Sequence, residues 1–235
     1  MQREQHALAT KSSSSLLSPL ERRLARRVVP HIPAWLETHH LTLLTLAWCA
    51  GLVLFGSLAA RDLRWLWASS LMVVMHYLTD FFDGKVGKYR DTGLVRWGFY
   101  MDHLLDFFFL CAVLAGYSFV LPASSHFHLF LVLSVFGGLV LNSFLAFTAT
   151  GRLHISHMKL GPTEFRIALV VINALVVFYG TRRMAKALPF VAAGGLVMLC
   201  ALVFRTQREL WWRDMEHKQR ADRARAVLVA QEEAA

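Results

Sequence analysis

Six long apolar runs limit what this chain can fold into more than any other feature. They lie at 41–60, 64–82, 98–121, 127–149, 164–180 and 188–204, and each approaches the roughly 20 residues that a helix needs to cross a bilayer. No water satisfies backbone groups inside a bilayer, so such runs fold as helices. With 56% hydrophobic and 17% charged residues, the composition also departs from that of an ordinary soluble domain. We therefore predict an all-α, polytopic membrane protein with six transmembrane helices.

The distribution of basic residues predicts the orientation of these spans. Of the 25 Lys and Arg residues, all but five lie on the side of the six runs that holds both termini. Because Lys and Arg accumulate on the cytoplasmic side, both termini are predicted to be cytoplasmic. A net charge of +9 suits either nucleic acid or anionic lipid, and the apolar composition favours lipid over nucleic acid.

Four regions follow from this layout: a disordered polar tail at 1–17, an interfacial amphipathic helix with its connection at 18–40, a six-helix transmembrane catalytic domain at 41–205 and a cytoplasmic tail at 206–235. In the second region Leu20, Leu24 and Val28 recur every four residues. The four arginines of its other face suit the anionic cytoplasmic leaflet. A solvated basic arm is the alternative. The arginines are Arg22, Arg23, Arg26 and Arg27.

Two pairs of aspartates carry the most information about function. Asp80 and Asp83 are three apart near the end of the second run, and Asp102 and Asp106 are four apart near the start of the third. Residues at these spacings share one face of a helix. A short connection makes the two helices antiparallel, so we expect the four carboxylates to converge near the cytoplasmic surface.

Clustered carboxylates repel one another unless cations neutralise them, and oxygen ligands without His or Cys favour Mg²⁺ or Mn²⁺. The alternative is that these acids simply face water. Between the pairs, glycines allow a ligand close to the backbone, and basic residues add positive charge. Divalent ions beside bases are typical of phosphoryl transfer. The candidate substrate-binding residues here are Gly84, Lys85, Gly87, Lys88, Arg90 and Gly98.

These residues resemble the signature of the CDP-alcohol phosphatidyltransferase family, D-x-x-D-G-x-x-A-R, about eight residues, then G-x-x-x-D-x-x-x-D. The aspartates, Gly84 and Gly98 stand where that motif requires them. The six-span layout with an interfacial N-terminal helix is also similar to the family fold. Two departures are visible: Gly87 and Lys88 replace Ala-Arg, and nine residues separate Lys88 from Gly98. Because lysine lacks the guanidinium fork, Arg90 is a candidate to supply it.

The resemblance implies that an alcohol hydroxyl attacks the phosphate of a CDP-alcohol and that CMP is released. It implies that Asp80, Asp83 and Asp102 hold one divalent ion, and that Asp102 shares a second ion with Asp106, a two-metal site. Asp106 is then the candidate general base. Arg166, near the cytoplasmic start of the fifth run, is a candidate ligand for a substrate phosphate, with helix capping of that end as the alternative reading of the segment.

Several alternatives stay open at this level. The donor is either CDP-diacylglycerol with a polar alcohol as acceptor, or CDP-choline or CDP-ethanolamine with diacylglycerol. A divalent-cation transporter or channel would also bury carboxylates in the membrane, and a catalytically inactive scaffold would tolerate the change at Gly87 and Lys88. We expect a protein of the bacterial cytoplasmic (inner) membrane, and the resemblance implies a homodimer.

Overall fold

The computed structural model describes residues 18–92, 94–150 and 162–233, and within them the secondary structure is helical. The predicted tail 1–17 lies outside the described residues. Three short 3₁₀ segments, Val29–His31, Leu63–Trp65 and Ala123–Ser125, precede longer elements. The α-helices are α2 (Ser18–Val28), α3 (Thr38–Ala59), α4 (Leu66–Arg90), α5 (Val95–Val120), α6 (His126–Thr150), α7 (Pro162–Tyr179) and α8 (Arg182–Glu233).

Four segments of the described chain are helical, long and apolar enough to cross a membrane: Thr38–Ala59, Val95–Val120, Ala123–Ala149 and Arg182–Arg223. They correspond to the first, third, fourth and sixth predicted spans. The second and fifth predicted spans are helices too, α4 and α7, but they are not among these four. The end of α4 is strongly polar, since Asp80, Asp83 and Lys85 fall in its last eleven residues. A six-span topology therefore remains a prediction.

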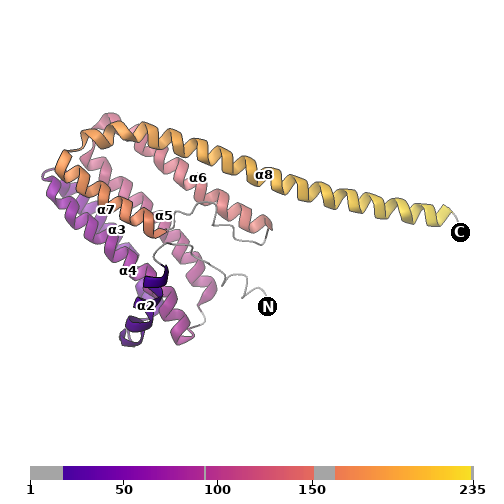
Figure 1. Ribbon diagram of the computed structural model, residues 1–235, viewed down its shortest axis with the longest axis horizontal. Coiled ribbons are helices and arrows are strands. Elements are labelled where there is room, and N and C mark those ends of the chain that lie inside the picture. Colours follow the sequence, from indigo (N-terminus) through magenta and orange to yellow (C-terminus); the bar gives the residue numbers. More distant parts are fainter. Residues whose placement is uncertain (1–17, 93, 151–161, 234–235) are drawn as a thin grey trace.

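The long helices form a bundle in which α3 packs against α4 and α5, α4 packs against α7, and α6 packs against α8 (Figure 1). One apolar core joins all six helices from α3 to α8, because each contributes at least one buried side chain to it. Its members include Leu52 on α3, Val73 on α4, Phe109 and Val113 on α5, Val132 on α6, Leu169 on α7 and Leu188 on α8.

Helices α3 and α5 touch backbone to backbone at two glycines. A Cβ atom added to Gly56 would lie 2.4 Å from the Cα atom of Gly116, and one added to Gly116 would lie 3.0 Å from the carbonyl oxygen of Leu52. Small residues at such crossings let membrane helices approach closely and gain dispersion contacts. This contact sets the distance between α3 and α5, both of which contribute to the site described below.

A chain of side-chain hydrogen bonds ties three helices together in the bundle. The Tyr117 hydroxyl on α5 donates to Asn173 Oδ1 on α7 at 2.7 Å, and Asn173 Nδ2 donates to Ser70 Oγ on α4 at 3.0 Å. All three residues are buried. Because unsatisfied polar groups are expensive in an apolar medium, these bonds fix α7 against α4 and α5.

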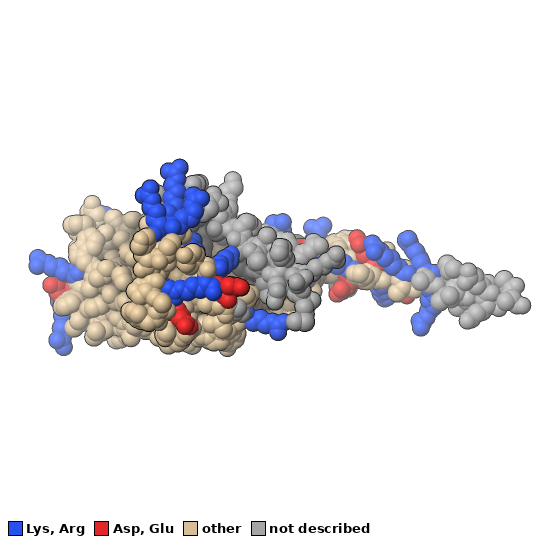
Figure 2. Space-filling view, turned by 90° about the horizontal axis from the view of Figure 1, so that it is seen from below, with Lys and Arg blue, Asp and Glu red and all other residues tan. Residues whose placement is uncertain are grey.

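Helix α2 packs on the ends of α3 and α4 that lie near the aspartates. Ala25 and Val29 share a second apolar cluster with Leu41, Phe81 and Val86. The side chains of Arg23, Arg26 and Arg27 are exposed. Figure 2 shows that basic side chains gather in groups on the surface of the bundle. The helix is thus where the sequence predicts one, and its placement at a membrane surface remains a prediction.

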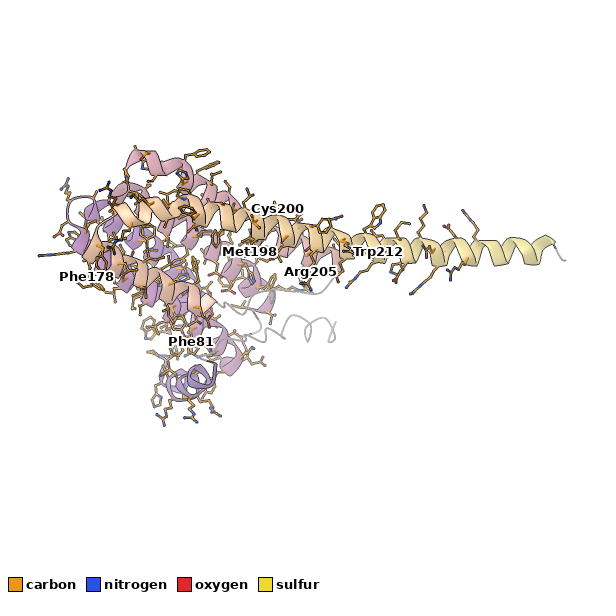
Figure 3. All side chains as sticks on the ribbon, turned by 45° about the horizontal axis from the view of Figure 1, so that its top comes forward. Phe81, Phe178, Met198, Cys200, Arg205 and Trp212 are labelled. Atoms are coloured by element: carbon orange, nitrogen blue, oxygen red, sulfur yellow. The ribbon has the colours of Figure 1, made fainter. Side chains whose placement is uncertain are left out.

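Helix α8 is much longer than the bundle. Its 52 residues run from the sixth predicted span into the predicted tail without a break, and the second half projects away from the other helices (Figure 1). Trp212, near the start of the projecting half, is 58% exposed and points into the surroundings (Figure 3). Ion pairs at helical spacing, Glu209 with Arg213 and Glu216 with Arg220, stabilise this half modestly.

Candidate active site

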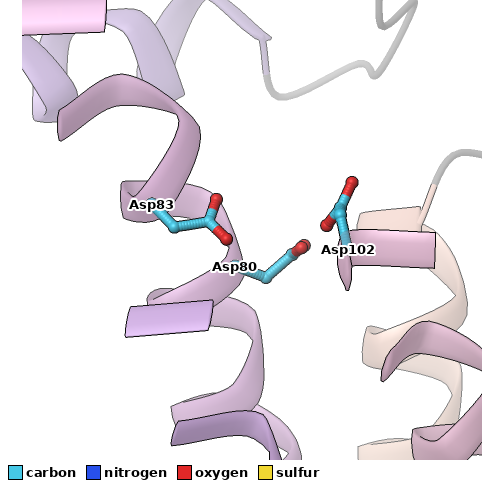
Figure 4. Close-up of side chains that lie close together, drawn as sticks. All are labelled: Asp80, Asp83 and Asp102. Carbon is cyan, nitrogen blue, oxygen red and sulfur yellow. The ribbon is translucent and has the colours of Figure 1, made fainter. Parts of the chain in front are cut away.

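Three of the four predicted aspartates lie together between α4 and α5. Asp80, Asp83 and Asp102 each offer one carboxylate oxygen, and these oxygens all lie within 4.8 Å of one another. Figure 4 shows the two side chains of α4 pointing toward Asp102, which comes from the facing turn of α5. The i, i+3 spacing on α4 and the antiparallel start of α5 produce this arrangement, as the sequence predicts for these three. The fourth aspartate of the prediction, Asp106, does not belong to this group.

Asp83 is the most buried member, with 9% of its surface exposed. Thr42, which is also buried, donates a hydrogen bond from its hydroxyl to Asp83 Oδ2 at 3.0 Å. The Gly84 backbone N–H donates to the other oxygen of the same carboxylate. Helix α3 therefore helps to fix the carboxylate, since Thr42 lies in its second turn.

Asp106 is connected to the site through Arg166 on α7. The Arg166 Nη2 atom lies 2.9 Å from Asp80 Oδ2 and 3.3 Å from Asp106 Oδ1. On its other side the guanidinium donates from Nε to His76 Nδ1 at 3.2 Å. The structure thus brings Arg166 into the predicted group of acids, where its positive charge offsets part of their mutual repulsion.

The three candidate glycines have different surroundings. A Cβ atom at Gly84 or Gly98 would meet no heavy atom within 4 Å, so no packing contact in the described structure requires glycine there. At Gly87 a Cβ atom would lie 3.1 Å from Thr38 Oγ1, so glycine here allows α4 to approach the start of α3. The open space beside Gly84 and Gly98 is compatible with the predicted approach of a ligand, whereas Gly87 has a packing reason of its own.

The three candidate basic residues of α4 also differ in their surroundings. Lys88 is exposed near the end of α4. Lys85 Nζ donates to the carbonyl oxygen of Phe81 at 3.0 Å and lies over that residue's ring. The Arg90 guanidinium donates to backbone carbonyls of the connection between α2 and α3, including those of Ile32 at 2.8 Å and Leu36 at 2.9 Å. The structure therefore gives Arg90 a role in holding this connection, and its contact with substrate remains a prediction.

Two residues of the site were assigned no role from the sequence. Thr42 belongs to a row of buried threonines on α3, with Thr38 and Thr45, and such polar spacing in an apolar run is a signal of an inward face. His76 lies four residues before Asp80, which places both on one face of α4. The residue is only 1% exposed, and its ring stacks on Phe109 with ring centroids 3.9 Å apart.

The donor set fits a hard divalent ion. Three carboxylates offer oxygens that lie within 4.8 Å of one another, and none of the three grouped residues is His or Cys. Oxygen-only ligands suit Mg²⁺ or Mn²⁺ rather than zinc or copper. An ion there would also neutralise like charges that burial otherwise makes costly.

An all-helical bundle with spans long enough for a bilayer and a cluster of carboxylates defines an integral membrane protein with a candidate metal centre. The sequence model of the CDP-alcohol phosphatidyltransferase family matches residues 38–207, well over half of the chain. The chain therefore belongs to this family, which is a family of transferases. No curated protein and no solved structure matches this chain. Membership favours a transferase over the cation transporter that buried carboxylates also permit.

Proposed function

We propose that this protein transfers a phosphatidyl or phospho-alcohol group from a CDP-alcohol to an acceptor hydroxyl and releases CMP, in dependence on Mg²⁺ or Mn²⁺. The convergence of Asp80, Asp83 and Asp102 within 4.8 Å is the observation that carries the proposal. Family membership supplies the reaction class. The site lies at the end of the bundle beside the basic helix α2, where a polar nucleotide and a membrane lipid can meet.

In this proposal the three grouped aspartates hold the first ion, and Asp102 and Asp106 share a second. Bound ions would neutralise charge on the phosphates and acidify a nearby hydroxyl. Thr42 keeps the carboxylate of Asp83 oriented through its hydrogen bond at 3.0 Å. Gly84 and Gly98 leave room for the nucleotide, while Lys85 and Lys88 offset its negative charge.

Asp106 is the proposed general base. As the acceptor oxygen forms its bond to phosphorus, the bond between phosphorus and the CMP oxygen breaks, and the hydroxyl proton passes to the Asp106 carboxylate. That carboxylate is accessible enough for the role, since 44% of its side-chain surface is exposed. Arg166, which contacts it, is also placed to interact with a substrate phosphate.

The remaining parts of the proposal concern topology and partners. The six apolar runs support six spans, and the distribution of basic residues supports cytoplasmic termini and a cytoplasmic site. Helix α2 lies on the membrane surface, the segment 206–235 is cytoplasmic, and two copies form a homodimer in the bacterial inner membrane. For the substrates we retain two pairings, CDP-diacylglycerol with a polar alcohol and CDP-choline or CDP-ethanolamine with diacylglycerol.

The direct experiment supplies purified protein in liposomes with Mg²⁺ or Mn²⁺ and each donor and acceptor pairing, and measures CMP release. We expect release with at least one pairing. Replacing Asp106 by asparagine should lower the rate by about a hundred- to ten-thousandfold, the usual contribution of a general base. Asp214→Asn, the same change on the exposed half of α8, should leave the rate unchanged. Equal rates for wild type and Asp106→Asn would exclude Asp106 as the base.

Replacing Gly84 by alanine tests whether the open space beside it receives substrate. The fold should be retained or slightly stabilised, because the added Cβ meets nothing within 4 Å and alanine favours the helix. If the nucleotide approaches the backbone there, kcat/KM should fall by about tenfold or more. Gly194→Ala, at a position that is equally open but lies on α8, is the matched control. An unchanged kcat/KM in Gly84→Ala would remove Gly84 from the substrate site.

A further inference from the structure

The guanidinium of Arg166 lies among the acids of the site. Its side chain is 7% exposed, and a single nitrogen, Nη2, contacts carboxylates from two helices, Asp80 on α4 and Asp106 on α5. Charge-assisted contacts of this kind are stronger than ordinary hydrogen bonds. In the described structure Arg166 therefore acts as a counterion that links these two aspartates.

The other edge of the guanidinium has a fixed anchor. Arg166 Nε donates to His76 Nδ1 at 3.2 Å, which assigns the imidazole proton to Nε2. His76 is itself held by stacking on Phe109, with ring planes only 14° apart. Because the anchor lies on Nε, the side chain can keep this contact while Nη2 exchanges one oxygen partner for another.

The position of Arg166 divides the four aspartates into two groups. Asp80, Asp83 and Asp102 have ligand atoms within 4.8 Å of one another, and Asp106 does not belong to this group. Asp106 instead contacts the same guanidinium nitrogen as Asp80. A divalent ion shared between Asp106 and the grouped acids would lie next to the Arg166 guanidinium, which already contacts Asp80 and Asp106. The repulsion between the ion and the guanidinium would weaken binding of this ion.

We propose that Arg166 is a displaceable counterion that withholds Asp106 from divalent ions, and from the acceptor hydroxyl, until a phosphate of the nucleotide draws the guanidinium away. This inference rests on the proposed function and adds the order in which the ions and the nucleotide bind. The three grouped aspartates bind the first ion, and Asp80 shares its carboxylate between that ion and Arg166. Asp106 then becomes available only after Arg166 exchanges its carboxylate contact for a phosphate, a partner that the guanidinium fork matches well.

Binding of Mn²⁺ to the detergent-purified protein, followed by electron paramagnetic resonance, tests this order without relying on turnover. Wild type should bind one Mn²⁺ tightly in the absence of nucleotide. Addition of CDP, which carries the phosphates but no group to transfer, should allow a second Mn²⁺ that is magnetically coupled to the first. The coupled signal should be lost in Asp106→Asn with CDP present.

Replacing Arg166 by glutamine should remove the requirement for CDP. Glutamine retains hydrogen bonding but carries no charge, so the affinity for the second Mn²⁺ without CDP should rise by roughly ten- to hundredfold, as expected when one charge-assisted contact no longer competes. Arg183→Gln is the matched control, because Arg183 lies on the first turn of α8 against Tyr179, outside the site. Its Mn²⁺ binding should equal that of wild type.

The outcomes separate this inference from the proposed function. Two equally tight Mn²⁺ ions in wild type without CDP would overturn the role of Arg166 while leaving the transferase proposal intact. An unchanged second affinity in a folded Arg166→Gln protein would do the same. If Arg166→Gln does not fold, the inference is tested by wild type alone, through the effect of CDP on binding of the second Mn²⁺. Failure of wild type to bind any Mn²⁺, with or without CDP, would overturn both.

Discussion

Replacing Asp83 by asparagine should abolish CMP release. The substitution keeps the shape of the side chain and still offers an oxygen to the Thr42 hydroxyl, now 3.0 Å away, so the fold should survive. It removes one of three converging carboxylates, however, and metal ions contribute several kcal/mol to the stabilisation of the transition state. We expect the rate to fall by about a thousandfold or more. Thermal unfolding should show that added Mn²⁺ no longer stabilises the protein as it does wild type.

Asp91→Asn is the matched control for this substitution. Asp91 lies directly after α4, is exposed and adopts a left-handed conformation with φ 50°, which asparagine also tolerates. Both variants replace an aspartate of the same region by asparagine. Asp91→Asn does so just after the end of α4, whereas Asp83→Asn does so within the carboxylate cluster. Wild-type activity in Asp83→Asn, or an equal loss in Asp91→Asn, would contradict the assignment of Asp83 as a metal ligand.

Replacing Gly56 by leucine should destabilise the protein severely. Even its Cβ atom would lie 2.4 Å from the Gly116 Cα atom, a backbone atom that no rotamer change can move. Helices α3 and α5 must separate to admit the side chain, and overpacking of this kind costs about 3 kcal/mol or more. The loss should appear as a lower midpoint of thermal unfolding in detergent. Activity should fall with it, because α3 carries Thr42 and α5 carries Asp102.

Gly194→Leu provides the comparison. Gly194 lies within α8, is exposed, and has no heavy atom within 4 Å of an added Cβ. Leucine favours a helix over glycine, so this change should be neutral or stabilising. Similar unfolding midpoints for the two variants would show that the contact between Gly56 and Gly116 does not hold α3 against α5.

Local periodicity was sufficient to predict the helices and part of the site. The six apolar runs correspond to helices α3 to α8, because a run of that length has few other ways to satisfy its backbone. The spacing of Asp80 and Asp83, together with the antiparallel turn to α5, predicted the convergence with Asp102. The segment after Phe204 was interpreted as a cytoplasmic tail with a polar helix, and its continuity with the helix of the sixth span was not predicted.

Contacts between distant parts of the chain could not be predicted from spacing. The bond between Arg166 and His76 joins residues 90 positions apart, and the contact between Arg166 and Asp106 joins residues 60 apart. Both depend on how α7 packs against α4 and α5, which an apolar run alone does not specify. Arg90 illustrates the same limit, because its hydrogen bonds to carbonyl oxygens more than 50 residues earlier in the chain could not be predicted from its position beside the candidate site.

The unbroken length of α8 also has a mechanical consequence. At 1.5 Å per residue its 52 residues span about 78 Å, more than twice the hydrocarbon thickness of a bilayer. No tilt within the usual range fits such a rod into the hydrocarbon layer, so part of α8 lies outside that layer. A small tilt of the first half of α8 would move its C-terminal end over a large distance. A fluorophore or binding protein attached at that end would therefore report on tilting of the helix.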